Sequence, residues 1–262
     1  MTTQAPASLS HDGLTIQRRS SEDEHTYSRF SESENMVSVF DGHGGKGVAD
    51  FLKQNFHTLV AEQLQRIRDS LKVSDEEVTK TLTAILREIN QKILDNPEIK
   101  EHGATLSSIL RVGNKLIAFH TGDGRIIGCK GNEIKYVSND HKPTNPDETA
   151  RIRDAGGVVF KGRVCGGLAV SRAMGDGSYS DWVIPDPEVA VLNVSDFTHF
   201  IVFSDGVHDS MKNEEIAKCH TTKQISDIVA SRASPYMERN DDYTSCFFWL
   251  DFDYKANVMA TA

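Results

Sequence analysis

Residues 36–47 read M-V-S-V-F-D-G-H-G-G-K-G, an apolar run that stops at an aspartate and continues into glycines. Met36–Phe40 predicts a buried strand, and Asp41 follows directly at its end. Four glycines within the next six residues leave room for the backbone to approach a ligand closely. A carboxylate in such a place is suited to holding something charged, which is either a phosphate-bearing cofactor or a metal ion.

The sequence on either side of this stretch predicts the fold class. Apolar residues at three- and four-residue steps predict helices over residues 47–69 and 74–94, the second beginning with the capping box S-D-E-E. The period then changes to short β-like runs separated by glycine turns, which predict an antiparallel meander over residues 104–112, 115–121, 125–130 and 133–137. Further strands are expected at residues 13–17, 158–164, 168–171, 189–194, 199–204 and 245–250. Shorter helices are expected at residues 147–155, 213–218 and 222–231. Strands in runs and helices in pairs favour an α+β fold with antiparallel sheets over a doubly wound fold.

Composition limits the classes of protein to consider. With 262 residues we expect one catalytic domain over residues 13–255, a disordered N-terminal arm over 1–12 and a C-terminal tail over 256–262. The formal net charge of -9 argues against a nucleic-acid partner, and no run of 18 apolar residues predicts a membrane span. Four scattered cysteines and the lack of a secretory signal favour a reducing compartment, the cytosol or the nucleus.

Two other functions fit parts of the sequence. Residues 42–47 satisfy the dinucleotide fingerprint G-x-G-x-x-G, but Asp41 would face the pyrophosphate and no further β-α-β unit follows. A cysteine phosphatase needs Cys-x5-Arg, whereas Cys165 and Arg172 are separated by six residues. Both functions are therefore disfavoured.

Three aspartates stand at the ends of apolar runs: Asp41, Asp205 and Asp241. If they converge at one edge of the sheets, their mutual repulsion calls for cations between them. Oxygen ligands without a cysteine or histidine cluster select Mg²⁺ or Mn²⁺, and two such ions can activate a water for phosphoester hydrolysis. The spacing alone leaves convergence open, since an isolated Asp-Gly is more often a turn.

Eight short motifs make the comparison specific. They are R-R-S-S-E-D at 18–23, V-F-D-G-H-G-G at 39–45, G-A-T-L at 103–106, T-G-D-G-R at 121–125, D-H-K-P with E-x-x-R-I at 140–152, L-A-V-S-R-A-M-G-D at 168–176, F-S-D-G-V-H-D at 203–209 and D-D-Y-T at 241–244. In this order, they resemble the motifs of the metal-dependent serine/threonine protein phosphatases of type 2C. The resemblance covers nearly the whole chain and implies a four-layer α-β-β-α sandwich, in which helix pairs flank two antiparallel sheets.

The resemblance also implies a role for each matching residue. Asp41 would bridge two Mg²⁺ or Mn²⁺ ions, with the remaining ligands being Asp205, Asp241, Glu22 and the carbonyl of Gly42, and with Asp23 supporting the cluster through a water. Asp123 and Asp209 match the acids of a weaker third metal site. Arg18 would grip the substrate phosphate, and His43 would protonate the leaving seryl or threonyl oxygen.

The implied reaction is hydrolysis of phosphoserine and phosphothreonine in protein substrates by a water that bridges the metals, in a monomeric enzyme. Four residues depart from the family pattern: Gly124, His208 and Asp242, where serine, tryptophan and asparagine are usual, and Ser21, where a larger residue is usual. The segment after Asp176 is short, so the flap near the active site looks trimmed. The short flap and Asp242 motivate an alternative: a catalytically weak module with the same fold that binds phosphoproteins.

Overall fold

The computed structural model describes residues 11–17, 21–232, 242–250 and 255. Two of the expected site residues, Arg18 and Asp241, lie outside the described residues, as does the expected C-terminal tail. The first strand begins at His11, two residues before the expected start of the domain.

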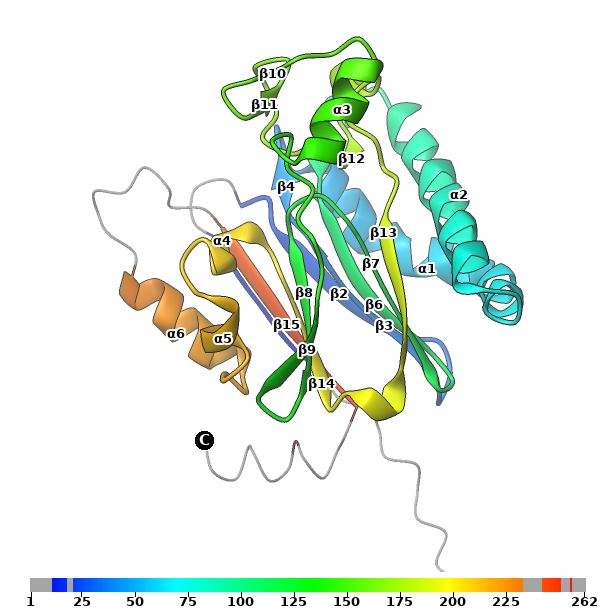
Figure 1. The fold of residues 1–262 in the computed structure, drawn as a ribbon, viewed down its shortest axis with the longest axis vertical. Helices are drawn as coiled ribbons and strands as arrows, with labels where there is room; N and C mark the ends of the chain where they lie inside the picture. The colour runs from blue at the N-terminus through cyan, green and yellow to red at the C-terminus, as the bar shows by residue number, and fades with distance from the viewer. Residues whose placement is uncertain (1–10, 18–20, 233–241, 251–254, 256–262) are drawn as a thin grey trace, which may run out of the picture.

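Two five-stranded antiparallel sheets face each other at the centre of the molecule (Figure 1). The first has the order β13-β7-β6-β3-β2 and consists of β2 (Glu24–Arg29), β3 (Glu34–Phe40), β6 (Leu106–Val112), β7 (Lys115–Thr121) and β13 (Glu188–Asn193). The second has the order β1-β15-β14-β8-β9 and consists of β1 (His11–Ile16), β8 (Arg125–Lys130), β9 (Glu133–Val137), β14 (His199–Phe203) and β15 (Tyr243–Trp249).

Strand β3 is buried on both faces, which explains its continuous apolar sequence. Met36 and Phe40 belong to the cluster between this sheet and the helices, whereas Val37 and Val39 belong to the cluster between the two sheets. Because β3 is held in this way on both sides, the residues that follow it have a fixed starting point.

Helices cover the outer faces of both sheets. The pair α1 (Gly47–Leu71) and α2 (Asp75–Leu94) packs on the first sheet, and α4 (Asp205–His208), α5 (Asn213–Ile216) and α6 (Thr222–Arg232) lie beside the second (Figure 1). The expected α+β sandwich of four layers is confirmed; among the described residues, α4, α5 and α6 rather than one pair of helices lie beside the second sheet. No helix in the described part of the chain combines the length and apolar character needed to cross a bilayer.

The expected meander over residues 104–137 is wrong as a single sheet. The hairpin β6–β7 belongs to the first sheet and the hairpin β8–β9 to the second, so the chain changes sheet between Thr121 and Arg125. Gly122 makes the crossing possible: its φ is +111°, and a Cβ there would lie 2.5 Å from that of Thr105. A strand expected to begin at Ala104 is also interrupted, since β5 (Gly103–Ala104) joins β4 (Gly42–His43) in a separate small sheet.

Residues 139–187, which we call the flap segment, form a lobe at one end of the sheets (Figure 1). The segment contains α3 (Pro146–Asp154), β10 (Val159–Phe160), β11 (Arg163–Val164), β12 (Met174–Gly175) and the short 3-10 helix η1 (Gly177–Tyr179). A second 3-10 helix, η2 (Val194–Asp196), follows β13. Residues 168–171 are not a strand as expected; Leu168 makes one isolated bridge to Val164.

The flap segment has an apolar cluster of its own, built from Ile152, Val164, Val170, Ala173 and Val183. Most of the segment precedes Asp176, so the short stretch after Asp176 is only its last part. The expectation of a trimmed flap was based on that last part alone, and the lobe itself is built by the preceding residues.

Candidate active site

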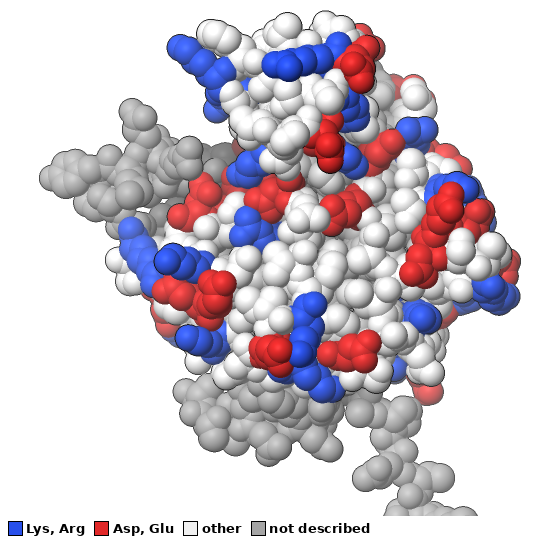
Figure 2. Space-filling model, viewed as in Figure 1, with Lys and Arg blue, Asp and Glu red and all other residues white. Residues whose placement is uncertain are grey.

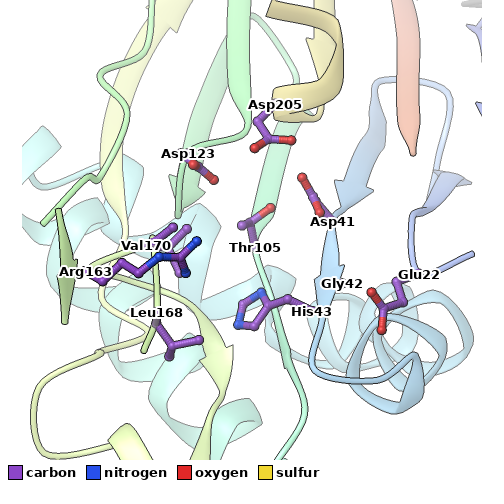
Figure 3. A pocket seen from close by; sticks show the side chains of 11 residues that line it. Glu22, Asp41, Gly42, His43, Thr105, Asp123, Arg163, Leu168, Val170 and Asp205 are labelled. Carbon is purple, nitrogen blue, oxygen red and sulfur yellow. The ribbon is translucent and has the colours of Figure 1, made fainter. Parts of the chain in front are cut away.

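A pocket of about 250 Å³ opens where the strand ends meet the flap segment (Figure 3). Its lining residues come from both sheets and from the flap segment: Glu22, Asp41, Gly42, His43, Thr105, Asp123, Arg163, Leu168, Ala169, Val170 and Asp205. Figure 2 shows several acidic side chains along the boundary between this lobe and the body of the molecule. The structure therefore brings together residues from six of the eight sequence motifs.

Asp41 lies directly after β3, where the strand leaves the first sheet. Its carbonyl oxygen accepts a hydrogen bond from the Thr105 amide at 2.8 Å, which fixes the backbone at this point. Gly42 then passes close to Glu22: a Cβ on Gly42 would lie 2.7 Å from the Glu22 carbonyl oxygen. The glycine is thus required by close backbone approach, as the sequence predicted, although the described contact is with protein rather than with an ion.

Asp123 and Asp205 face Asp41 across the pocket (Figure 3). Asp123 lies in the loop where the chain changes sheet, and Lys142 Nζ lies 3.4 Å from its carboxylate. Asp205 begins α4, and Ser204 separates it from the end of β14. Figure 3 shows the carboxylates of Asp41, Asp123 and Asp205 around the same part of the pocket, while Glu22 lies below Asp41, beside Gly42. Asp209 directly follows α4 and is not among the residues that line the pocket.

Asp23 lies behind the pocket wall and is 2% exposed. The Ser204 hydroxyl donates a hydrogen bond to its Oδ2 at 2.7 Å. Burial raises the pKa of Asp23 to about 7, with the negative charge of Asp242 adding to the effect and the hydroxyls of Ser204 and Thr244 opposing it. Asp242 also accepts a hydrogen bond from the Glu22 amide at 2.8 Å. Asp23 and Asp242 thus place two acidic side chains behind the pocket, next to Ser204 and the Glu22 amide.

The donor chemistry fits a hard divalent cation. The residues that line the pocket include four with carboxylate side chains (Glu22, Asp41, Asp123 and Asp205) and no cysteine, and carboxylate oxygens suit Mg²⁺ or Mn²⁺. Among the described residues, however, no three histidine, cysteine, aspartate or glutamate side chains come close enough together to hold an ion. Asp241, the further ligand implied by the resemblance, lies outside the described residues.

His43 is anchored by Asp176, a contact that the sequence did not reveal. Nε2 of His43 lies 2.8 Å from Oδ2 of Asp176, and the Asp176 side chain is 4% exposed. Burial lowers the pKa of His43, but the hydrogen bond to Asp176 and the charges of Asp176, Asp123 and Glu22 outweigh it, so the pKa is raised above its ordinary value. Asp176 is the last residue of the motif L-A-V-S-R-A-M-G-D, so the match to this motif was the sequence feature that could have drawn attention to Asp176.

Two further residues of the site were not assigned a role from the sequence. Arg163 lines the pocket from β11, and Figure 3 shows its guanidinium group extending toward the pocket. His208 Nε2 donates a hydrogen bond to the Asp123 carbonyl at 2.9 Å, which ties α4 to the Asp123 loop. His208, which stands where the family usually has tryptophan, thus connects the helix that begins with Asp205 to the loop that carries Asp123.

Comparison with known proteins agrees with the fold and the motifs. The family model described as "Protein phosphatase 2C" matches residues 8–234. "Probable protein phosphatase 2C 59" of Oryza sativa subsp. japonica is 37% identical over 188 residues, which are 70% of this chain and 56% of that protein. "Probable protein phosphatase 2C 45" of the same organism is 34% identical over 80% of this chain and 74% of its own length. The chain thus spans little more than half the length of some curated relatives.

Solved structures resemble the fold with less sequence identity. The "serine-threonine phosphatase 2C from Toxoplasma gondii" superposes with a TM-score of 0.74 and 19% identity, covering 94% of this chain and 96% of its own. At this identity the likeness supports the fold alone, whereas the family model matches most of the sequence. By that match, this chain belongs to the protein phosphatase 2C family.

Proposed function

We propose that this protein is a Mg²⁺- or Mn²⁺-dependent phosphatase that hydrolyses phosphoserine and phosphothreonine in protein substrates. The observation that carries the proposal is the pocket in which Asp41, Asp123 and Asp205 face one another beside His43. Carboxylates that line one pocket offer the oxygen ligands that divalent cations prefer, and a histidine beside them is suited to proton transfer to a leaving group. Membership of the family supports the same reaction.

Asp41, Asp205, Asp241, Glu22 and the Gly42 carbonyl would hold two ions, and Asp123 with Asp209 a weaker third. When bound, such ions lower the pKa of water to supply a nucleophile at neutral pH and offset the charge of the phosphate. Asp23 would support the ligands from behind, consistent with its place in the wall beside Ser204. Asp242 would steady Glu22 through the hydrogen bond from the Glu22 amide.

Arginine and histidine side chains would handle the substrate itself. A guanidinium group suits a phosphate because its donors are planar and paired. Arg18 is the arginine that the resemblance assigns to this role, and Arg163 would contribute a second cation from the flap segment. His43 would hold the proton that the leaving seryl or threonyl oxygen takes when the ester bond breaks.

Hydrolysis of a phosphothreonine peptide tests the proposal. We expect phosphate release with Mn²⁺ or Mg²⁺ and none after full chelation. We also expect Asp205→Asn to lower turnover by about 100-fold or more, because one carboxylate of the cation site is lost. Asp227→Asn is the matched control, since Asp227 lies on the exposed face of α6 and is paired only with Lys223 among the contacts described for it.

Two results would overturn this function. Activity that survives complete chelation would exclude the metal-dependent mechanism, and near-normal turnover by the Asp205→Asn variant would remove Asp205 from the site. Phosphopeptide binding by the wild-type protein with turnover at background would instead favour the alternative, a binding module with the same fold.

A further inference from the structure

Asp176 is brought to His43 by the small sheet β4-β5-β12. The register of this sheet pairs His43 with Gly103 and Gly103 with Gly175, so Asp176 is one residue beyond the last pair. Its carboxylate then reaches across the middle strand to Nε2 of His43 at 2.8 Å. The contact therefore joins two segments that are 133 residues apart in the sequence.

Gly103 leaves the space in which this contact forms. A Cβ on Gly103 would lie 2.2 Å from Nε2 of His43 and 2.3 Å from Oδ2 of Asp176. Any other residue at this position would have to push the two groups apart. Glycine at residue 103 therefore leaves the room that the hydrogen bond between His43 and Asp176 needs.

The backbone of Asp176 is fixed independently of His43. Its amide donates to the His102 carbonyl at 2.8 Å, and its own carbonyl accepts from the Tyr179 amide at 2.8 Å. The Gly175 amide donates to Oδ1 of Asn90 on α2 at 2.7 Å. Asp176 has a φ of +53°, a left-handed conformation that is uncommon outside glycine and is tolerated best by Asn and Asp. These hydrogen bonds hold the backbone of Asp176 in this conformation and so orient its carboxylate toward His43.

The contact determines which nitrogen of His43 faces the substrate. A carboxylate only accepts hydrogen bonds, so Nε2 carries the hydrogen that lies between His43 and Asp176. The other nitrogen, Nδ1, is then available to the pocket. Figure 3 shows the His43 ring projecting into the pocket with one nitrogen turned toward Thr105.

We propose that Asp176 is the positioning residue of His43, which fixes its ring and tautomer so that Nδ1 delivers the proton to the leaving oxygen. This rests on the proposed function. As a water oxygen bonds to phosphorus, the ester P–O bond breaks, and the leaving oxygen takes its electron pair and the Nδ1 proton. His43 becomes neutral and keeps its Nε2–H hydrogen-bonded to Asp176. The proton that the attacking water loses goes to solvent, and His43 takes up a new proton from solvent.

The variant Asp176→Asn tests this role, because asparagine tolerates the left-handed backbone but lacks the charge and can present its amide to His43. We compare a phosphothreonine peptide with p-nitrophenyl phosphate, whose leaving group needs no proton. We expect kcat on the peptide to fall about 100-fold and kcat on p-nitrophenyl phosphate to change less than about threefold. Gly103→Ala should reproduce this pattern, and Asp181→Asn, an exposed aspartate five residues away, should change neither rate.

A double variant separates positioning from general structural damage. Added to His43→Ala, Asp176→Asn should cause no further loss on the peptide, because both changes remove the same proton transfer. Equal losses on the two substrates by the Asp176→Asn variant, or additive losses in the double variant, would overturn the proposal.

A measurement without substrate keeps this inference apart from the proposed function. If the wild-type protein hydrolyses neither substrate, the proposed function fails, and the tautomer of His43 still tests its contact with Asp176. We expect ¹⁵N NMR of the imidazole to show hydrogen on Nε2 in the neutral wild-type side chain. Hydrogen on Nδ1 in the neutral wild-type side chain would overturn it.

Discussion

Glu148 is a buried carboxylate at the base of the flap segment, held between two arginines. Its Oε2 accepts from Arg151 Nη2 at 2.8 Å, and its Oε1 accepts from Arg172 Nη2 at 2.5 Å. Arg172 in turn donates to the Asp186 carbonyl, and Arg151 donates to the carbonyls of Ser171 and Trp182. One side chain therefore connects α3 to both ends of the stretch that carries Asp176.

The charge of Glu148 should contribute strongly to stability. Burial raises its pKa, but the hydrogen bonds from Arg172 and Arg151 outweigh burial and lower the pKa to about 2. We expect Glu148→Gln to reduce the free energy of unfolding by about 3 kcal/mol at pH 7, because two arginines lose their counter-charge. Urea denaturation measures the change. The control Glu88→Gln removes the exposed partner of Arg66 and should cost less than about 1 kcal/mol.

The contacts of Glu148 with its two arginines also predict how the stability of the protein depends on pH. A folded pKa below the ordinary value of about 4.3 means that the contribution is present above that pH and is lost as the pH falls toward 2. The stability of the Glu148→Gln variant should therefore fall less than that of the wild-type protein between pH 4.5 and about 2.5. Parallel curves for the two proteins would show that the charge of Glu148 is not what stabilises this junction.

At the scale of single elements, α2 shows a cap that the sequence already indicated. Ser74 precedes the helix with an extended backbone, and its Oγ accepts from the Glu77 amide at 3.1 Å.

Strand β2, in contrast, is not indicated by its own sequence. Its sequence E-H-T-Y-S-R has no apolar alternation, and it is a strand because β3 pairs with it along its whole length.

Removing the cap should weaken α2 by a predictable amount. We expect Ser74→Ala to reduce the free energy of unfolding by about 1 kcal/mol, because an amide in the first turn loses its acceptor. The matched control is Gln54→Ala on the exposed face of α1, which should change stability by less than about 0.5 kcal/mol. Thermal and urea denaturation check both variants. Equal effects of the two substitutions would mean that the Ser74 hydroxyl does not cap the helix measurably.

At the scale of the whole molecule, two histidines of different parts of the fold are deeply buried. His141, in the flap segment, is 5% exposed, and His199, on β14, is fully buried and packs against Phe247 and Trp249 on the helix-covered face of the second sheet. Burial lowers the pKa of His141 to about 2, with the positive charges of His120 and Arg172 adding to the effect. Burial likewise lowers the pKa of His199 to about 3, with the charge of His220 adding to it. Both are therefore neutral in the folded protein at physiological pH.

These histidines should make the fold sensitive to mild acid. Below pH about 6.5 the unfolded chain binds protons at both positions and the folded chain does not, so stability falls by about 1.4 kcal/mol per pH unit for each. His141 and His199 together make the free energy of unfolding fall as the pH falls between pH 6.5 and 5. We expect His199→Phe to remove about half of this contribution to the slope. Urea denaturation at several pH values measures it. The control Gln54→Ala, at an exposed position on α1 with no titratable group, should leave the slope unchanged; an unchanged slope in His199→Phe would contradict the assignment.

The sequence by itself determined the elements whose signals are local. The long helices, the strand Met36–Phe40 and the cap at Ser74 followed from periodicity and turn chemistry, which act over a few residues. The motifs also determined the family, and they named Asp41, Asp123, Asp205 and His43, which the structure places around one pocket. The roles of Arg18 and Asp241 stay predictions.

Only the tertiary structure decided which segments meet. It showed that the chain changes sheet at Gly122, that Arg163 lines the pocket from the flap segment, and that Asp176 holds His43. No local pattern encodes these contacts, because they depend on the packing of segments far apart in the sequence. Gly103 is the clearest example: its lack of a side chain is explained only when β4 and β12 lie on either side of it.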